Sequence, residues 1–168
     1  MSLIKELLDT LPQSGQLEWI GIRPIKRGIV QEVDEVEIHF EDGIKGDHYS
    51  KKGGKRMITL IQKEHLDVVA SILKVEKVDP SLVRRNLVVS GINLLSLNNR
   101  QFTIGEDVIL EVTGHCHPCS RMETNLGPGG YNAMRGHGGL TAKVIKSGKI
   151  RLGDKVKLII NDHANLNL

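Results

Sequence analysis

The sequence is poor in aromatic residues and in cysteine, and it has no long apolar run. Phe, Trp and Tyr make up 3% of the 168 residues, so the core must be built mainly from Val, Ile and Leu. Too few rings are present to stack on a nucleic acid, and the net charge of +3 is small and its basic residues are scattered, so we expect no nucleic-acid partner. No apolar stretch approaches the roughly 20 residues that a membrane-spanning helix needs, so we expect no membrane segment.

The length of the chain fits one folded domain. The first residues have the leucine spacing of a helix over 3–11, but Lys5, Glu6 and Asp9 interrupt the apolar pattern. This predicts a surface helix rather than a signal peptide, and therefore a cytoplasmic protein whose cysteines stay reduced unless they are catalytic or metal-bound. We expect an N-terminal helical extension at residues 1–18, one domain at 19–162 and a flexible tail at 163–168.

The hydrophobic pattern predicts a mainly β protein with two or three short helices. Only residues 62–73 have a clear helical stripe, and Asp79-Pro80 is typical of the start of a second short helix. A doubly wound α/β fold needs helices between most of its strands, so we expect a β-barrel-like domain instead. The expected strands are 19–23, 33–40, 57–61, 87–91, 101–105, 107–114, 142–150 and 155–160.

Both cysteines lie in one short segment, His115-Cys116-His117-Pro118-Cys119. With nearby histidines they could bind zinc, although no second Cys-x-x-Cys pair completes a set of four ligands. They could form a redox dithiol, a motif that usually opens a helix, but the glycines and proline of residues 127–130 allow little helix here. They could also be two small buried apolar residues. The remaining interpretation is a single reactive thiolate that binds a metal or accepts sulfur.

A glycine-rich run, GPGGYNAMRGHGG, follows at residues 127–139. Its peptide N–H groups could form an anion-binding nest, and Arg135 and His137 within it favour ligand contact over a flexible connection. The run matches neither the dinucleotide nor the P-loop fingerprint. Further cations occur at Lys55-Arg56 and Arg84-Arg85-Asn86, and arginine suits phosphate oxygens because it donates two hydrogen bonds in a fork. We predict that these segments, with the loop at 46–48, surround one open cleft next to Cys119.

Several segments, taken in order, resemble the MOSC family, the domain found at the C-terminus of molybdenum cofactor sulfurases and as stand-alone bacterial proteins. Each segment is short, but the ordered set is specific and spans about residues 20–160. The matching segments are 43–48, 53–56 with 58–61, 84–94, 116–119, 136–139 with 144–145, 148–150 and 153–156.

The resemblance implies a β-barrel-like fold and a molybdopterin-type ligand, the molybdenum cofactor. It also implies that Cys119, the residue after the proline, coordinates molybdenum or carries sulfur, which leaves Cys116 as an extra thiol. The other candidates are groups that would hold the cofactor or lie near the thiol. The cofactor-binding candidates are Lys55, Arg56, Arg84, Arg85, Asn86, Arg135, His137, Gly138 and Gly139, and the secondary candidates are Cys116, Asp47, His48 and His115.

Three functions stay open on this basis. The first is an enzyme that uses the molybdenum cofactor to reduce N-hydroxylated substrates, as some stand-alone relatives do. The second is a carrier that holds a persulfide on Cys119 and delivers sulfur to the cofactor or to metal–sulfur centres, and the third is a dithiol oxidoreductase. The larger sulfurases obtain sulfur from an attached pyridoxal phosphate domain. This chain is too short to contain one, so we expect no pyridoxal phosphate and a separate sulfur-donor or redox partner protein.

Overall fold

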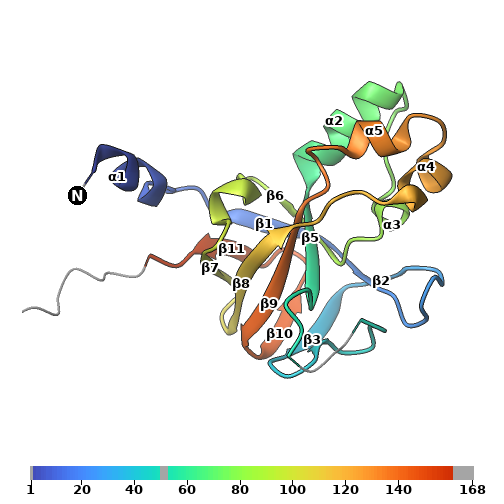
Figure 1. Ribbon diagram of the computed structural model, residues 1–168. Coiled ribbons are helices and arrows are strands. Elements are labelled where there is room, and N and C mark those ends of the chain that lie inside the picture. The colour runs from blue at the N-terminus through green and yellow to red at the C-terminus, as the bar shows by residue number, and fades with distance from the viewer. Residues whose placement is uncertain (1, 50–52, 161–168) are drawn as a thin grey trace, which may run out of the picture.

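The computed structural model describes residues 2–49 and 53–160, and a closed barrel of seven strands forms its centre (Figure 1). Around the barrel the strands run in the order β11, β7, β8, β9, β5, β6 and β1, and pairing of β1 with β11 closes the ring. β2 extends β1 at the edge, while β10, β3 and β4 form a second sheet. The strand bounds are β1 Gly15–Ile22, β2 Gln31–Val33, β3 Glu35–His39, β4 Gly43–Ile44, β5 Ile58–Gln62, β6 Leu87–Ser90, β7 Gln101–Ile104, β8 Val108–His115, β9 Leu140–Lys146, β10 Gly148–Arg151 and β11 Lys155–Leu158.

The alternation of side chains along the strands divides the core into two parts. On β5, Leu60 belongs to the large apolar cluster shared by the barrel strands, and its neighbour Ile61 belongs to a smaller cluster with the helices. On β6, Leu87 and Val89 belong to the first cluster and Val88 to the second. This period of two is the property of a strand that is covered on both faces. The barrel therefore has a filled interior and a second apolar face on which helices pack.

Four helices gather at one end of the barrel, whereas the first helix lies apart from it (Figure 1). The smaller cluster joins α2, α3, α4 and α5 to strands β1, β5 and β6. The N-terminal helix α1 has no buried residue and is held by Arg100, which donates to the Leu8 carbonyl and to Asp9. The helix bounds are α1 Leu3–Asp9, α2 Lys63–Leu73, α3 Pro80–Val83, α4 Ser120–Leu126 and α5 Gly130–Met134, with a 3₁₀ turn at Leu94–Leu97.

The predicted mainly β barrel is confirmed, but the described residues contain five α-helices rather than two or three. The helices α4 and α5 form on both sides of the glycines that were expected to prevent helix. Gly127 and Gly129 take positive φ angles of 87° at the end of α4 and the start of α5. The Glu123 carboxylate accepts hydrogen bonds from the N–H groups of Gly129 (2.8 Å) and Tyr131 (3.0 Å), and these bonds lower the pKa of Glu123. Glycine thus makes the turn between two helices, and Glu123 stabilises it.

The sequence led to expectations for both ends of the chain. The strand β1 begins at Gly15, so the barrel starts inside the segment that was expected to be an N-terminal extension. The expected tail at 163–168 lies outside the described residues. Among the helices of the described ranges, none is long and apolar enough to cross a membrane.

Candidate functional site

The strand β8 carries the cysteine segment to the helical end of the barrel. Cys116 follows directly after β8 and is buried, with 5% of its surface exposed, whereas Cys119 is exposed and caps the N-terminus of α4. Residues 116–119 contain no turn or bend. Three extended peptide units span about 10 Å, and a disulfide needs Cα atoms about 4.4–6.8 Å apart. The described conformation therefore does not favour the dithiol interpretation.

Cys119 lies in an open cleft that is lined mainly by cations. Two adjoining hollows, of about 180 and 510 Å³, share Arg23, Tyr49, Arg84, Cys119 and Arg121. No Asp or Glu is among the described residues that line either hollow. We call the two hollows together the arginine cleft; its other lining residues are Lys26, Arg27, His48, Arg56, Thr59, Arg85, Cys116, His117, Ser120 and Met122.

The positive charges in the arginine cleft are close enough to affect one another. Burial lowers the pKa of Arg84. The nearby charges of Arg121 and Arg23 lower this pKa further, whereas Asp47 and Cys119 raise it. Arg84 ends α3 in the left-handed conformation, with φ of 58°, and one of its Nη atoms donates to the Gly28 carbonyl at 2.7 Å. A guanidinium that loses hydration and faces other guanidinium groups gains most from an anion placed between them. The electrostatics of the cleft thus favour an anionic ligand.

Asp47 lies behind one wall of the cleft and holds the residues of that wall by hydrogen bonds. Its carboxylate is buried and accepts bonds from the backbone N–H and the guanidinium of Arg23, from the Asn86 side chain at 3.4 Å, and from the Tyr49 N–H at 3.1 Å. Asn86 is completely buried, and its side-chain oxygen accepts from the Thr59 N–H. Asp47 and Asn86 therefore hold Arg23 and Tyr49 in place rather than face the cleft. The Tyr49 ring lies beside the Arg23 guanidinium, with 5.8 Å between the guanidinium carbon and the ring centroid.

Arg85 lines the cleft, but backbone carbonyls already occupy its guanidinium. It is 6% exposed and donates to the carbonyls of Gly138 (2.8 Å), Val83 (2.7 Å) and Cys116 (3.3 Å). Burial lowers its pKa most, Cys116 and Cys119 oppose that effect, and Arg23 and Arg56 add to it. Arg85 thus joins the cysteine segment to the glycine-rich run.

The end of the glycine-rich run lies against the cysteine segment and the strand β5. A Cβ on Gly138 would overlap the Cys116 carbonyl, and a Cβ on Gly139, whose φ is 89°, would overlap the Leu60 carbonyl. The Cys116 N–H donates to the Gly139 carbonyl at 2.8 Å. Close backbone packing therefore accounts for glycine at both positions, and contact with the cofactor stays a prediction for them.

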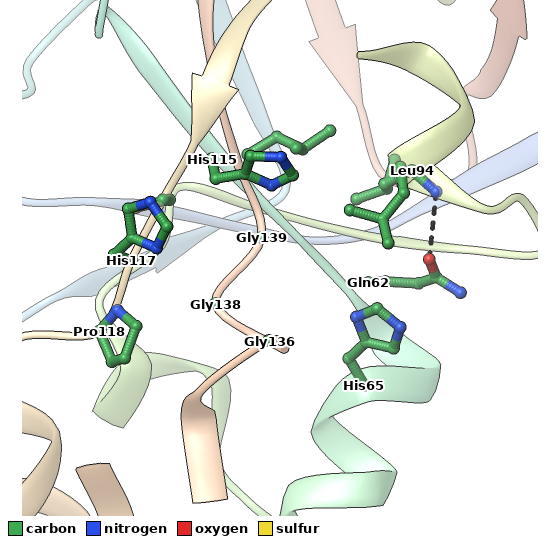
Figure 2. Close-up of a pocket in the computed structure, with 12 residues that line it drawn as sticks. Gln62, His65, Leu94, His115, His117, Pro118, Gly136, Gly138 and Gly139 are labelled. Carbon is green, nitrogen blue, oxygen red and sulfur yellow. Dashed lines mark hydrogen bonds between the residues drawn. The ribbon is translucent and has the colours of Figure 1, made fainter. Parts of the chain in front are cut away.

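A smaller hollow, of about 120 Å³, is lined by this same end of the glycine-rich run (Figure 2). It shares Cys116 and His117 with the arginine cleft. In Figure 2 the His65 and Gln62 side chains of the α2 region and the rings of His115 and His117 surround the backbone of Gly136–Gly139. We call this hollow the histidine pocket; it is lined by Gln62, His65, Leu94, Leu95, His115, Cys116, His117, Pro118, Gly136, Gly138, Gly139 and Leu140.

The structure thus distributes the predicted site residues over three places. Cys119, Arg56, Arg84, Arg85, Cys116 and His48 line the arginine cleft, Asp47 and Asn86 lie behind it, and His115, Gly138 and Gly139 line the histidine pocket with Cys116. The exposed side chains of Lys55 and Arg135 line none of these hollows, and His137 lies edge-on to His65 with 5.3 Å between ring centroids.

Sequence reasoning missed several lining residues of the cleft, among them Arg23, Tyr49, His117 and Arg121. Arg121 could have been found, because it lies two positions after Cys119 in the sequence. His117 could also have been found, because it lies between the two cysteines. Tyr49 directly follows the loop at 46–48 that was expected at the cleft, whereas Arg23 follows a strand without a motif and only the folded barrel brings it to Cys119.

No set of three His, Cys, Asp or Glu side chains is placed to hold a metal ion in residues 2–49 and 53–160. A metal that already carries its own sulfur ligands needs no such set, since one thiolate completes its coordination. Within the described part, Cys119 is the exposed cysteine, and it faces the cations of the cleft.

Comparison with known proteins identifies the fold and the family. The model of the MOSC domain matches residues 35–157. The crystal structure of the YuaD protein from Bacillus subtilis matches with a TM-score of 0.77 and 20% identity, covering 89% of this chain and 98% of that one. YiiM from Escherichia coli matches with a TM-score of 0.65 and 20% identity, covering 86% of this chain and 70% of that one. YiiM from Geobacillus stearothermophilus matches with a TM-score of 0.69 and 16% identity, covering 89% and 77%. Among curated protein sequences, none matches.

Proposed function

The chain belongs to the MOSC domain family, and from that premise we propose that its arginine cleft binds a molybdenum–pterin cofactor through the Cys119 thiolate. One observation carries the proposal: the exposed cysteine lies in a cleft lined by arginines and, among the described lining residues, by no carboxylate. A thiolate is a soft ligand suited to molybdenum, and guanidinium groups suit the phosphate that such a cofactor carries.

The cleft residues fall into two roles in this proposal. Cys119 supplies the metal ligand from the start of α4, where its backbone is fixed by the helix that follows. Arg84 and Arg121 neutralise the phosphate, because they are near each other and the pKa of Arg84 is already lowered by burial and by Arg121. Lys26 and Arg27 line the larger hollow and attract an anionic ligand before it docks.

Arg23 and Tyr49 form a third element of the proposed site. Asp47 anchors the Arg23 guanidinium and the Tyr49 backbone, so the ring is presented to both hollows while 42% of Tyr49 stays exposed. A planar pterin gains stacking energy on such a ring, and the arginine beside it compensates anionic oxygens. Tyr49 thus favours a flat heterocycle over a simple phosphate.

The reaction that we favour is reduction of an N-hydroxylated compound to the amine and water, with two electrons and two protons from a redox partner. The bound cofactor supplies the two-electron oxygen-transfer chemistry. The chain contributes an open cleft, so that both substrate and partner reach the same side, and cations that retain the cofactor between turnovers.

A persulfide carrier is the second candidate, and the exposure of Cys119 supports it too. In that reaction the Cys119 thiolate attacks the outer sulfur of a donor persulfide, and the donor leaves as its thiolate while Cys119 becomes the persulfide. Arg84 and Arg85 interact electrostatically with Cys119, so the cations of the cleft would attract an anionic sulfur donor. This candidate needs no retained molybdenum, which separates it from the first.

The test is metal and pterin content of the chain produced in cells that synthesise the molybdenum cofactor. We expect about one molybdenum per chain in the wild type, almost none in Cys119→Ser and near wild-type content in Cys116→Ser. Serine is similar in size to cysteine but a poor soft ligand.

Other outcomes discriminate among the candidates. A wild-type chain without molybdenum that accepts labelled sulfur from a persulfide donor on Cys119 would support the carrier. Equal losses in both serine variants would contradict the role of a single thiolate. Arg121→Gln, which leaves the thiol in place, should reduce pterin retention without changing the free energy of unfolding.

A further inference from the structure

The histidine pocket contains imidazole rings but, among its described lining residues, no carboxylate, lysine or arginine. His65 comes from α2 and His115 from the end of β8, so the barrel and the helices bring these rings together. Figure 2 shows His65 and His117 on either side of the glycine backbone, with the His115 ring toward Gly139. Imidazole donates from one ring nitrogen when neutral and from two when protonated. The pocket therefore offers side-chain donors without a competing anion.

Peptide N–H groups add to these donors. Gly136, Gly138 and Gly139 line the pocket, and none of their N–H groups donates to another described residue. The Gln62 side-chain oxygen accepts from the Leu94 N–H at 3.1 Å, so the Gln62 amide nitrogen is left as a donor at the pocket. Gly138 is buried and Gly139 is half-buried, and peptide groups in such positions are nearly always satisfied by a protein group, by water or by a ligand. An acceptor bound in the hollow would supply such a partner.

From these observations we infer that the histidine pocket binds a small oxyanion, such as sulfate, phosphate or a short carboxylate. The pocket adjoins the arginine cleft through Cys116 and His117, but the inference does not depend on the cofactor proposed in that cleft. Its volume of about 120 Å³ limits the ligand to a few non-hydrogen atoms. Leu94, Leu95 and Leu140 form an apolar part of the wall that suits the short carbon chain of a carboxylate.

Binding of an oxyanion should be linked to protonation of His65. Burial lowers the pKa of His65 most, the nearby His137 lowers it further, and Glu64 opposes them. An anion in the pocket favours the charged ring, so it raises the pKa of His65, and protonation in turn strengthens binding. The ionisable groups that face His65 or line the same pocket are Glu64 on its own helix and, from the segments packed against that helix, His137, His115, Cys116 and His117.

The test is NMR of the histidine rings of the full chain during titration with inorganic sulfate, which keeps its charge over the pH range used. We expect sulfate to move the His65 signal, to raise its pKa, and to bind several-fold more tightly at pH 6 than at pH 8. The upper limit is about tenfold, the ratio expected for one charge-assisted hydrogen bond. His65→Gln and His115→Gln should each weaken binding several-fold, whereas His39→Gln, on the distant strand β3, should leave it unchanged. Acetate and phosphate, titrated in the same way, distinguish carboxylates from tetrahedral anions.

Sulfate also has a place to bind among the arginines, so a cleft variant serves as the matched control. The response of His65 should persist in Arg121→Gln, and failure of cofactor binding in the Cys119 experiment would not affect it. An unchanged His65 signal in the presence of all three anions would overturn the inference. So would a response that is lost in Arg121→Gln and kept in His115→Gln, because the anion would then lie in the arginine cleft.

Discussion

Replacing Arg85 with alanine should lower the free energy of unfolding by about 3 kcal/mol. The guanidinium is 6% exposed and donates to three carbonyls, at 2.7, 2.8 and 3.3 Å. A charge-assisted hydrogen bond contributes about 1.5–3 kcal/mol, and the two short bonds together would reach roughly 3–6 kcal/mol. Part of this loss in stability is offset, because alanine removes the cost of desolvating a buried charge and because water reaches some of the carbonyls. The lower end of the range is therefore the expected loss.

Urea unfolding, followed by circular dichroism, measures this loss, and the melting temperature should fall by roughly 6–12 °C at about 2–4 °C per kcal/mol for a chain of this size. Arg85→Lys keeps the charge but cannot reach three carbonyls in a fork, so we expect an intermediate loss. Arg121→Gln is the matched control, since it removes a charge from the same cleft and the Arg121 side chain makes no hydrogen bond to another described residue. A loss below about 1 kcal/mol for Arg85→Ala would refute the reasoning, and Arg85 would then be free to bind a ligand phosphate.

Three further results are expected. Gly139→Ala should destabilise the chain by roughly 2 kcal/mol or more in urea unfolding, since φ is 89° and a Cβ would overlap the Leu60 carbonyl; unchanged stability would contradict that packing. Tyr49→Ala should weaken binding of a pterin carboxylate several-fold in fluorescence titration but leave binding of inorganic phosphate unchanged, and Tyr49→Phe should retain the ring's contribution. Asp79→Ala should cost about 1 kcal/mol near neutral pH through loss of the α3 cap. Hydrogen bonds from Ser81 lower the pKa of Asp79, so its contribution is complete above about pH 4 and is lost as the pH falls through the folded-state pKa; the two chains should then become equally stable in strong acid.

Most of the fold could be predicted because its signals are local. The nearly continuous apolar runs of segments such as 57–61 and 87–91 are typical of strands that are covered on both faces, and the apolar stripe of residues 62–73 reflects one buried face of α2. The helices α4 and α5 could not be predicted in this way. Their stability depends on Glu123, which accepts two backbone N–H groups across the turn, and on Met122 and Met134, which are buried in the cluster under the helices. Tertiary packing overrides the low helix propensity of glycine here.

The candidate site was predicted where a motif marked it and missed where only the barrel creates it. Cys119 and Arg84 belong to ordered motifs, and the structure brings both to one cleft. Arg23 lies just after β1 and reaches the same cleft because Asp47, from another loop, binds its side chain. The glycines at 138–139 show a second limit, since a nest and a close approach of two backbones require the same residue type. Only the structure distinguishes the two explanations, because it places the carbonyls of Cys116 and Leu60 against Gly138 and Gly139.

The cysteine segment is fixed by its backbone, which leaves the Cys119 side chain free for chemistry. The Cys116 N–H binds the Gly139 carbonyl, and Arg85 binds the carbonyls of both Cys116 and Gly138, so the segment is attached on two sides before Cys119 is reached. The helix α4 then fixes the segment from its other end. Because the backbone at Cys119 is already fixed, little further conformational entropy is lost when its thiol binds a ligand. Such preorganisation favours tight binding by a single side chain. It follows that substitutions at Arg85 or Gly139 should reduce stability and ligand retention together, whereas Cys119→Ser should reduce retention alone.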